Sequence, residues 1–454
     1  MDRTDLYQYC LDNRTITAYN CLVYKTKSPM NKDLMRQIMA DHKTMYLNRA
    51  LVSRDFPLET AVNYCFVGIR RAGKSYLIYQ QIQNLLENDV TLNQIVYINF
   101  EDERLLEISA QELNMILEIG LEYAGEGKLP YLFFDEIQNV PGWEKFARRV
   151  ADMKYRVSIT GSNSKMLSRE IASTLGGRFM IVQVFPYSFA EYLAANGKED
   201  IAAAAGGTLS TPQTAELSGL YDQYVKFGAF PELVEIKNKR DYLNSVYQTI
   251  YLGDVIARNK ITNEFAVRLI LKKIAEAVMN PLSFNRLCNI LKSAGAAIGK
   301  QTVINYVGHM IDSYMIFAVQ NYAAKLVDKE SSPKYYFMDT GLLGLALVNP
   351  DCAQLENLLA IELLRRYGKE EVFYFERNVE IDFYVPSKNL AFQASYSVLD
   401  NPDTLKRETA AFAKLRKFLP DARCLIVTNS EEATLAQDGF DIEVVPMRKF
   451  LLEK

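Results

Sequence analysis

The sequence predicts an α/β protein that begins with a parallel sheet and continues through a helical segment into a second α/β segment. In the first part, short apolar runs alternate with stretches whose apolar residues have helical spacing, a pattern typical of parallel strands covered on both faces. These runs are NYCFVG (63–68), QIVYINF (94–100), PYLFFDE (130–136), RVSIT (156–160) and FMIVQV (179–184). Helical patterns dominate from 218 to 280, and strand patterns return after 335.

Three other segments complete this outline. Residues 1–62 are polar-rich and include helical spacing in DLMRQIMADHKTMYLNRAL, so we expect a helical lead-in. Residues 196–214 (NGKEDIAAAAGGTLSTPQT) are small and polar, which predicts a loop or surface insertion. Residues 281–323 have the pattern helix, turn, helix, strand.

Composition limits the classes of protein that fit this chain. Its 454 residues suggest about three domains, and a formal net charge of −3 gives no global attraction to nucleic acid. The six cysteines are scattered without a CxxC pair, which argues against a zinc site or a disulfide framework. Two histidines, His42 and His309, are expected to be packing or surface residues. No apolar run approaches the about 18 residues of a membrane span. We therefore expect a cytoplasmic protein that does not enter a membrane.

The segment GIRRAGKS (68–75) follows the first apolar run and precedes a helical pattern. Glycines at this spacing let backbone N–H groups point inward to surround phosphates at a helix N-terminus. Lys74 would reach the β- and γ-phosphates of ATP, and Ser75 would hold Mg²⁺. A glycine turn beside a cationic helix start is the alternative, and the strand-loop-helix context argues against it. The residues expected to contact ATP are Gly68, Arg70, Arg71, Ala72, Gly73, Lys74, Ser75 and Tyr76.

A second motif supplies the carboxylates that such a loop needs. The run YLFFDE ends in Asp135, expected to bind the metal with Ser75, and in Glu136, expected to act as general base. SITGSNS ends another strand, where Ser162 and Asn163 are candidates to face the γ-phosphate. Arg178, before the last strand, is a candidate to stabilise transition-state charge in its own subunit or a neighbour's. A plain polar loop and an ordinary surface arginine are the alternatives for these later residues.

The ordered motifs resemble a large prokaryotic group of AAA-type ATPases whose C-terminal half is a domain of unknown function. The motifs that carry the resemblance are GIRRAGKSYL, YINFED, YLFFDEIQNV, ITGSNSKMLSREIASTLGGRF, VFPYSFAEYL and YVKFGAFPELVE. The resemblance implies an additional-strand, catalytic-glutamate P-loop NTPase fold, with a third strand between those that precede the phosphate loop and Asp135. Asp102 lies near that site without an assigned role. The expected domains are a lead-in (1–62), the ATPase core (63–193), a helical lid or linker (194–262), a winged-helix-like segment (263–334) and a restriction-endonuclease-like domain (335–454).

The segment SFNRLCNILKSAGAAIGKQTVINYVGHMIDSYMIFAVQNY resembles a winged helix. Leu287, Ile290 and Leu291 would pack its first helix, and residues 302–314 would form the second, which could enter a DNA groove. Between 263 and 340 there are nine Lys or Arg and six Asp or Glu, a difference of +3 and weak support for DNA. Contact with DNA and contact with a protein or another domain both stay open, as does the oligomeric state.

The last segment resembles a restriction-endonuclease-like fold with an incomplete metal site. Glu356 lies on a helix, and Glu380 and Asp382 lie on a strand. Where that fold has a second carboxylate and a lysine, this chain has Gln393 and Ser395. A neutral amide binds Mg²⁺ poorly, and a serine cannot replace an ammonium. We therefore expect no nuclease activity, unless a lysine arrives from elsewhere in the chain; Lys388 is a poor candidate.

These features together predict an ATPase that hydrolyses ATP slowly and couples its nucleotide state to the C-terminal modules. One alternative is an ATP-dependent DNA-binding or DNA-processing nuclease. A second is a signalling or assembly scaffold in which ATP is a switch.

Overall fold

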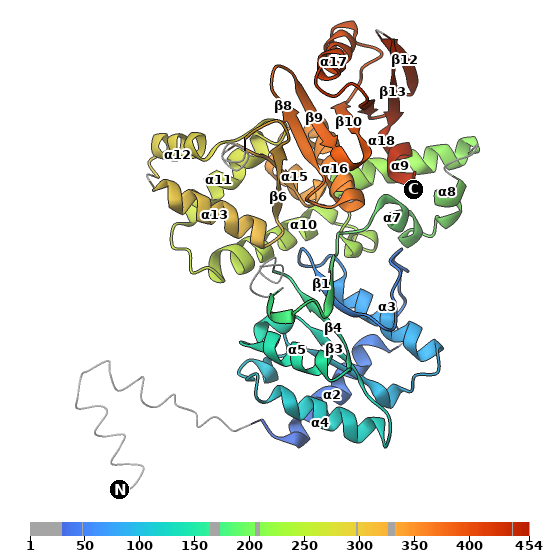
Figure 1. The fold of residues 1–454 in the computed structure, drawn as a ribbon, viewed down its shortest axis with the longest axis vertical. Helices are drawn as coiled ribbons and strands as arrows, with labels where there is room; N and C mark the ends of the chain where they lie inside the picture. The colour runs from blue at the N-terminus through green and yellow to red at the C-terminus, as the bar shows by residue number, and fades with distance from the viewer. Residues whose placement is uncertain are drawn as a thin grey trace, which may run out of the picture.

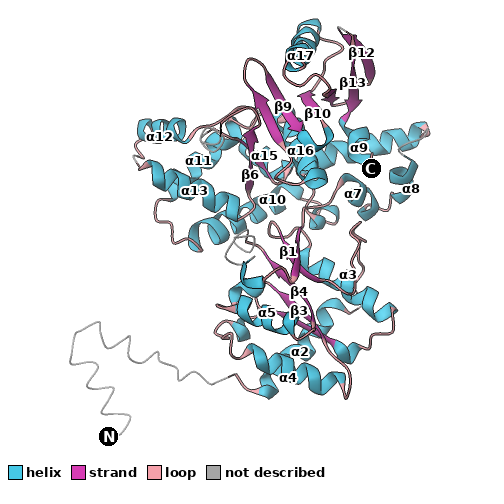
Figure 2. Cartoon of the chain, viewed as in Figure 1, coloured by secondary structure: helices cyan, strands magenta, loops and turns pink. Residues whose placement is uncertain are grey.

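The computed structural model describes residues 30–47, 49–163, 173–204, 209–296, 298–325, 332–437 and 439–453. Figure 1 shows a first sheet with its helices, blue to green, below a larger body of helices and strands, green to red. Figure 2 shows that strands gather in two separate groups, with α7 and α10 between them in this view. Within the described part of the chain, no helix is long and apolar enough to cross a membrane.

The first sheet has five strands in the order β2-β3-β4-β1-β5, and each neighbouring pair is parallel. The predicted sheet is therefore confirmed, and β4 separates the strand before the phosphate loop from the strand that ends at Asp135. All five residues of β1 are buried, as expected for a central strand covered on both faces. The strands are β1 (Asn63–Val67), β2 (Ile95–Asn99), β3 (Tyr131–Asp135), β4 (Arg156–Gly161) and β5 (Phe179–Gln183), and the helices are α2 (Lys32–Tyr46), α3 (Lys74–Glu87), α4 (Leu113–Ala124) and α5 (Trp143–Asp152).

The helical lead-in is shorter than the sequence predicts. Residues 1–29 lie outside the described part, and residues 49–62 contain no helix. Arg54 explains the extended course of this stretch, because its N–H donates to the Gln80 side chain on α3 and its carbonyl accepts from the same amide. The backbone N–H and carbonyl of Arg54, which a helix would pair internally, are thus satisfied by a side chain of a neighbouring helix.

A helical region follows the sheet. The prediction of a loop at 196–214 is wrong for two stretches, which form α8 (Glu199–Ala204) and the start of α9. Alanine has the highest helix propensity, and the buried Ile201 anchors α8. The predicted helix, turn, helix, strand pattern is confirmed by α12, α13 and β6. The helices are α7 (Phe189–Ala195), α9 (Thr211–Phe227), α10 (Lys239–Gln248), the π-helix η6 (Thr249–Ala257), α11 (Glu264–Glu276), α12 (Phe284–Ser293) and α13 (Lys300–Asp312).

The second sheet is mixed and has eight strands in the order β12-β13-β11-β10-β9-β8-β6-β7. The expected domain boundary between 334 and 335 falls inside β7, so the winged-helix-like segment shares a sheet with the last segment. Residues 354–364 of α16 are all buried, which places this helix in the core. The elements are β6 (Ile316–Asn321), β7 (Lys334–Phe337), α15 (Thr340–Ala346), α16 (Asp351–Tyr367), β8 (Phe373–Glu376), β9 (Glu380–Val385), β10 (Leu390–Ser395), α17 (Pro402–Leu415), β11 (Arg423–Thr428), β12 (Ala433–Gln437), β13 (Phe440–Pro446) and α18 (Met447–Leu452).

Candidate nucleotide site

The loop at 68–75 joins the end of β1 to the start of α3 and needs its glycines. Gly68 has φ 154°, and a Cβ there would lie 2.1 Å from the carbonyl oxygen of Val184. Gly73 has φ 94° and caps α3 in the left-handed region. A side chain at either position would be strained, so the tight turn in front of the helix depends on glycine.

Lys74 lies inside this loop with 4% of its surface exposed. Its Nζ donates to the carbonyl oxygens of Gly68 at 3.2 Å and Ile69 at 3.1 Å. The same nitrogen lies 3.7 Å from Oε1 of Glu136. The ammonium is therefore held just beyond the C-terminal end of β1, next to the carboxylate predicted to be the general base.

Asp135 ends β3 and Glu136 follows it directly, and both side chains are buried. Tyr97 donates its hydroxyl to Oδ2 of Asp135 at 2.8 Å, and the Thr160 hydroxyl donates to Oδ1. The N–H of Glu136 donates to that same threonine hydroxyl at 2.9 Å. Glu136 itself has φ 52°, in the left-handed region that is uncommon for glutamate. Such backbone positions occur often at functional sites.

The two carboxylates have opposite pKa shifts. Burial raises the pKa of Asp135, and the charge of Glu136 adds to this against hydrogen bonds from Ser75, Thr160 and Tyr97. Burial also opposes ionisation of Glu136. The charges of Lys74 and Arg70 and hydrogen bonds from Gln138 and Ser162 together outweigh burial and lower the pKa of Glu136. Glu136 is therefore ionised at neutral pH and able to accept a proton.

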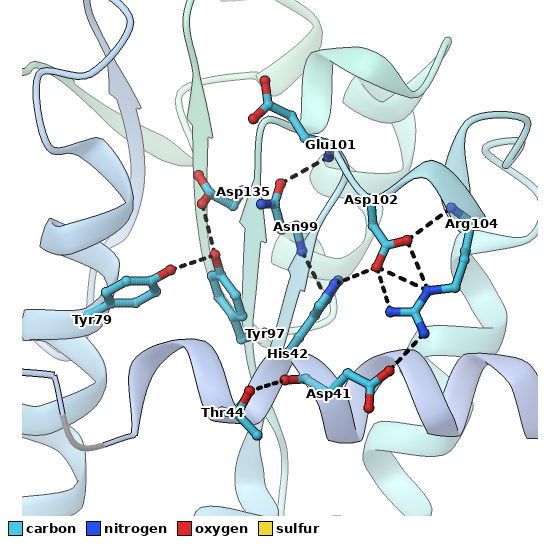
Figure 3. Close-up of polar contacts among 10 residues, drawn as sticks. All are labelled: Asp41, His42, Thr44, Tyr79, Tyr97, Asn99, Glu101, Asp102, Arg104 and Asp135. Atoms are coloured by element: carbon cyan, nitrogen blue, oxygen red, sulfur yellow. Dashed lines mark hydrogen bonds and ion pairs between the residues drawn. The ribbon is translucent and has the colours of Figure 1, made fainter. Parts of the chain in front are cut away.

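Near Asp135 lies a network of aromatic and charged side chains (Figure 3). The hydroxyls of Tyr79 and Tyr97 form a hydrogen bond at 3.1 Å. Because Tyr97 also donates to Asp135, this chain of hydrogen bonds connects α3 with Asp135. His42 is fully buried and accepts the Asn99 N–H on Nδ1 at 3.2 Å, so its Nε2 donates to Asp102 at 3.0 Å. Burial lowers the pKa of His42. This confirms the expectation that His42 is a packing residue.

Asp102, which had no predicted role, is part of this support. Arg104 holds it with several guanidinium hydrogen bonds, and these bonds lower the pKa of Asp102 to about 2. The sequence analysis missed Tyr97 altogether. Tyr97 stands on β2, the strand next to β3, two positions before the last residue of β2.

A cleft of about 490 Å³ opens in front of the loop and is lined by both halves of the chain. It brings together most of the predicted ATP-contacting residues with both carboxylates. The lining residues from the first half are Ala50, Val52, Arg54, Arg70, Arg71, Gly73, Lys74, Ser75, Tyr76, Asn99, Glu101, Asp135, Glu136 and Tyr187, and those from the second half are Pro231, Glu232, Glu235 and Thr249.

Five predicted residues do not line this cleft. One of them, Ser162, is buried and lies within hydrogen-bonding distance of Glu136. Gly68 and Ala72 belong to the loop but contribute backbone carbonyls, to Lys74 and Arg54 respectively. Asn163, two positions after the end of β4, is not among the lining residues. Arg178 pairs with Asp152 at 2.7 Å, 42% exposed, on the side of α5. Within one chain the cleft therefore receives no contribution from Arg178.

ATP and Mg²⁺ fit the donor set of this cleft. Lys74, Arg70 and Arg71 supply positive charge, and the glycine loop supplies backbone N–H groups at the start of a helix of 14 residues. Ser75 lies close enough to Asp135 to lower its pKa by a hydrogen bond, so a hydroxyl and a carboxylate meet where a hard cation prefers oxygen ligands.

A second charged cluster lies in the mixed sheet, and its centre is a residue that the sequence analysis missed. Lys334 of β7 is fully buried, and its Nζ lies 2.9 Å from Glu380, 3.3 Å from Asp382 and 3.6 Å from Glu356. Gln393 accepts the Asp382 N–H at 3.0 Å and donates to the carbonyl of Glu380. A lysine from elsewhere in the chain thus does reach the three carboxyl groups that the sequence analysis singled out, by a route that the sequence did not reveal.

This cluster does not form a ready metal site. Among the described residues, no group of three His, Cys, Asp or Glu side chains is arranged to hold an ion. Burial and the charge of Asp382 raise the pKa of Glu356 to about 8, so this carboxyl is mostly protonated at neutral pH. Tyr336 donates to it at 2.7 Å. The cation at the centre is the ammonium of Lys334.

The phosphate loop, the paired carboxylates and the parallel sheet define a P-loop ATPase of the AAA class. The family described as AAA domain matches residues 63–193, and the family described as domain of unknown function (DUF8612) matches residues 218–352. An uncharacterized protein of Methanocaldococcus jannaschii, MJ1544, is 32% identical over 439 residues, covering 93% of this chain and 96% of that protein. The chain belongs to this prokaryotic family, in which an AAA domain precedes the DUF8612 domain.

Other similar proteins are more divergent in sequence. An uncharacterized protein of Haemophilus influenzae is 26% identical over 372 residues, covering 78% of this chain and 89% of that protein. A Walker-type ATPase of Pyrococcus abyssi has a TM-score of 0.39 at 14% identity, covering 66% of this chain and 99% of that chain. The ORC1 protein of Aeropyrum pernix, solved in complex with DNA, has a TM-score of 0.27 at 13% identity, covering 73% and 93%. At these TM-scores the structural similarities carry no argument about function.

Proposed function

We propose that this protein binds ATP, hydrolyses it slowly and uses the nucleotide state to rearrange its C-terminal half. The observation that supports this most directly is the shared cleft. Lys74, Asp135 and Glu136 face the same space as Glu232 and Thr249 of the second half. A nucleotide there would contact both parts, and a ligand shifts a conformational equilibrium when its contacts differ between states.

The side chains have distinct roles in this proposal. Lys74 turns from the loop carbonyls to the β- and γ-phosphates, and Ser75 and Asp135 hold Mg²⁺. The bound ion would neutralise charge on the phosphate oxygens during transfer. Glu136 orients the attacking water and takes its proton, which the lowered pKa permits. Arg178 is 42% exposed and paired with Asp152, so we assign it to the site of a neighbouring copy.

The winged-helix-like segment is proposed to serve as an interdomain or protein contact. Its strand β6 pairs with β7 and with β8, so both strands after α13 extend the large sheet. DNA contact through α13 is the alternative, and stimulation of turnover by duplex DNA would favour it. Such stimulation would also favour a DNA-processing function over a switch in a scaffold.

We propose that the nuclease-like domain does not cleave DNA. The presence of Lys334 among the carboxylates is the one observation in favour of an ATP-dependent nuclease. Against it, the ammonium contacts all three carboxyl groups, so a metal ion would have to displace it. Gln393 is neutral, and Ser395 points its hydroxyl to the carbonyl of Ser397. The charge that a cleavage site needs is therefore already neutralised.

The test is ATP turnover by the full chain, with and without duplex DNA, in parent and Glu136→Gln protein. The amide keeps the shape of Glu136 but cannot accept a proton, so ATP should bind with parental affinity while hydrolysis falls by about 10²-fold or more. Hydrolysis at the parental rate in Glu136→Gln would show that the general base lies elsewhere. No binding and no turnover in the parent would refute the proposed function itself.

A further inference from the structure

An arginine of the phosphate loop is bound to the second half of the chain. Arg70 directs its guanidinium at Asp254 of η6, with Nε 3.0 Å from Oδ2 and Nη2 3.3 Å from Oδ1. Its remaining nitrogen, Nη1, lies 2.8 Å from Glu101. The loop that should receive phosphates is therefore joined by a two-point ion pair to a helix 184 positions further along the chain.

Asp254 is placed to hold a charge with or without Arg70. Its side chain is 3% exposed, and Arg258 contacts it at 2.8 Å from one turn further along the same segment. The Asn259 amide also donates to the Asp254 carbonyl at 3.2 Å. If Arg70 leaves, Asp254 keeps the second guanidinium, so the cost of an orphaned buried charge is avoided.

Phosphates would compete with Asp254 for the same guanidinium. The planar fork of arginine matches a carboxylate and a phosphate equally well, each by two parallel hydrogen bonds. Arg70 lines the cleft beside Lys74 and is part of the loop itself. A triphosphate in that cleft brings several negative oxygens to a cation now shared between Asp254 and Glu101.

We propose that Asp254 is a positioning residue for the nucleotide site. It holds Arg70 when the phosphates are absent and gives it up to them when a triphosphate binds, so that η6 senses the nucleotide state. This inference rests on the proposed function, since it requires that ATP enters the cleft, and it names the contact through which the second half responds.

The segment η6 is suited to such a response. A π-helix of nine residues, Thr249–Ala257, is rare, and such turns occur frequently at functional sites. It continues directly from α10, and the Tyr251 hydroxyl donates to the Glu264 carbonyl at the start of α11 at 3.0 Å. Helix α11 packs on β7, the strand that carries Lys334. Release of Arg70 would thus act on elements that reach the second charged cluster.

The experiment is hydrogen–deuterium exchange of the full chain, measured at residues 249–257 with and without the non-hydrolysable analogue AMP-PNP and Mg²⁺. In the parent, saturating AMP-PNP should increase exchange in this segment, because the ion pair that ties it to the loop is broken. In Asp254→Asn, exchange should be raised already and should not respond to the analogue. Calorimetry should show AMP-PNP binding about five-fold tighter to Asp254→Asn, because Arg70 no longer has to leave a charged partner.

Arg258→Met is the matched control. It removes the other guanidinium from Asp254 without touching the loop, so exchange in 249–257 should rise but still respond to AMP-PNP. A parent that binds and hydrolyses ATP without any change of exchange in this segment would overturn the inference. So would an Asp254→Asn protein that keeps the parental affinity and response. A parent that neither binds nor hydrolyses ATP refutes the proposed function instead, and the parental exchange measurement decides the question even if Asp254→Asn fails to fold.

Discussion

Lys334→Met should destabilise the protein strongly, and the structure sets the size of the effect. Methionine has a similar length and no charge, so the variant leaves three carboxyl groups without their cation. Glu380 is 46% exposed and can turn to water, whereas Asp382 is 17% exposed and Glu356 only 2%. Removing one partner of a buried ion pair costs about 3–5 kcal/mol. Because one of the three carboxylates is half in solvent, we expect the lower end, about 3 kcal/mol in the free energy of unfolding.

The pH dependence distinguishes this mechanism from a simple packing defect. Burial and Asp382 raise the pKa of Glu356 from 4.5 to about 8. The stability contributed by its protonated form is complete below 4.5 and is lost as the pH rises through about 8. Without the Lys334 ammonium, the ionised carboxylates are less stable, and protonation relieves this cost. The difference in the free energy of unfolding between variant and parent, measured with urea, should therefore be smaller in acid than in mild alkali.

Two controls sharpen this test. Lys388→Met removes an exposed lysine from the loop before β10 and should change the stability by less than about 0.5 kcal/mol. Lys334→Met combined with Glu356→Gln should recover part of the loss. Parental stability of Lys334→Met at every pH would refute the reasoning. So would a stabilisation of the nucleotide-free parent by Mn²⁺ that Asp382→Asn abolishes, because the cluster would then hold a metal.

Further predictions concern both sites. Lys74→Ala should weaken ATP binding about ten-fold or more by calorimetry, because it removes the cation for the phosphates; unchanged affinity would exclude the loop as the nucleotide site. Asp135→Asn should raise the Mg²⁺ concentration that half-maximal turnover requires, and an unaltered Mg²⁺ titration would remove this residue from the metal site. Tyr97→Phe should bind ATP normally but shift the same titration in the same direction, since its hydroxyl orients Asp135; an effect on ATP affinity alone would contradict that role. Gel assays with linear, supercoiled and single-stranded DNA, in Mg²⁺ or Mn²⁺ and with or without ATP, should show no cleavage, and nicking lost in Asp382→Ala would make the protein a nuclease.

The first half of the chain could be predicted because its information is local. A strand, a glycine turn and a helix start are contiguous at 63–75, and YLFFDE combines a strand with its terminal carboxylates in six residues. The order of strands followed from the resemblance and agrees with the sheet. What escaped prediction was support from a neighbouring strand. The Tyr97 hydroxyl reaches Asp135 across the sheet, and nothing in the periodicity of VYINF separates this tyrosine from an ordinary core residue.

In the second half of the chain, the charged cluster around Lys334 could not be predicted from the sequence, because it is assembled from four separate elements. Glu356 comes from α16, Glu380 and Asp382 from β9, Gln393 from β10 and Lys334 from β7. In the sequence, Lys334 stands before three aromatic residues in KYYF and has the appearance of a polar strand end at a domain boundary. The position of Lys334 among the carboxyl groups depends on the parallel pairing of β6 with β8. This pairing attaches β6 and its antiparallel partner β7 to the edge of the large sheet. A pairing between segments this far apart leaves no local pattern. The boundary drawn at 334/335 would remove this lysine from its carboxylates, and a fragment that begins at 335 should therefore be less stable than its predicted strands and helices suggest.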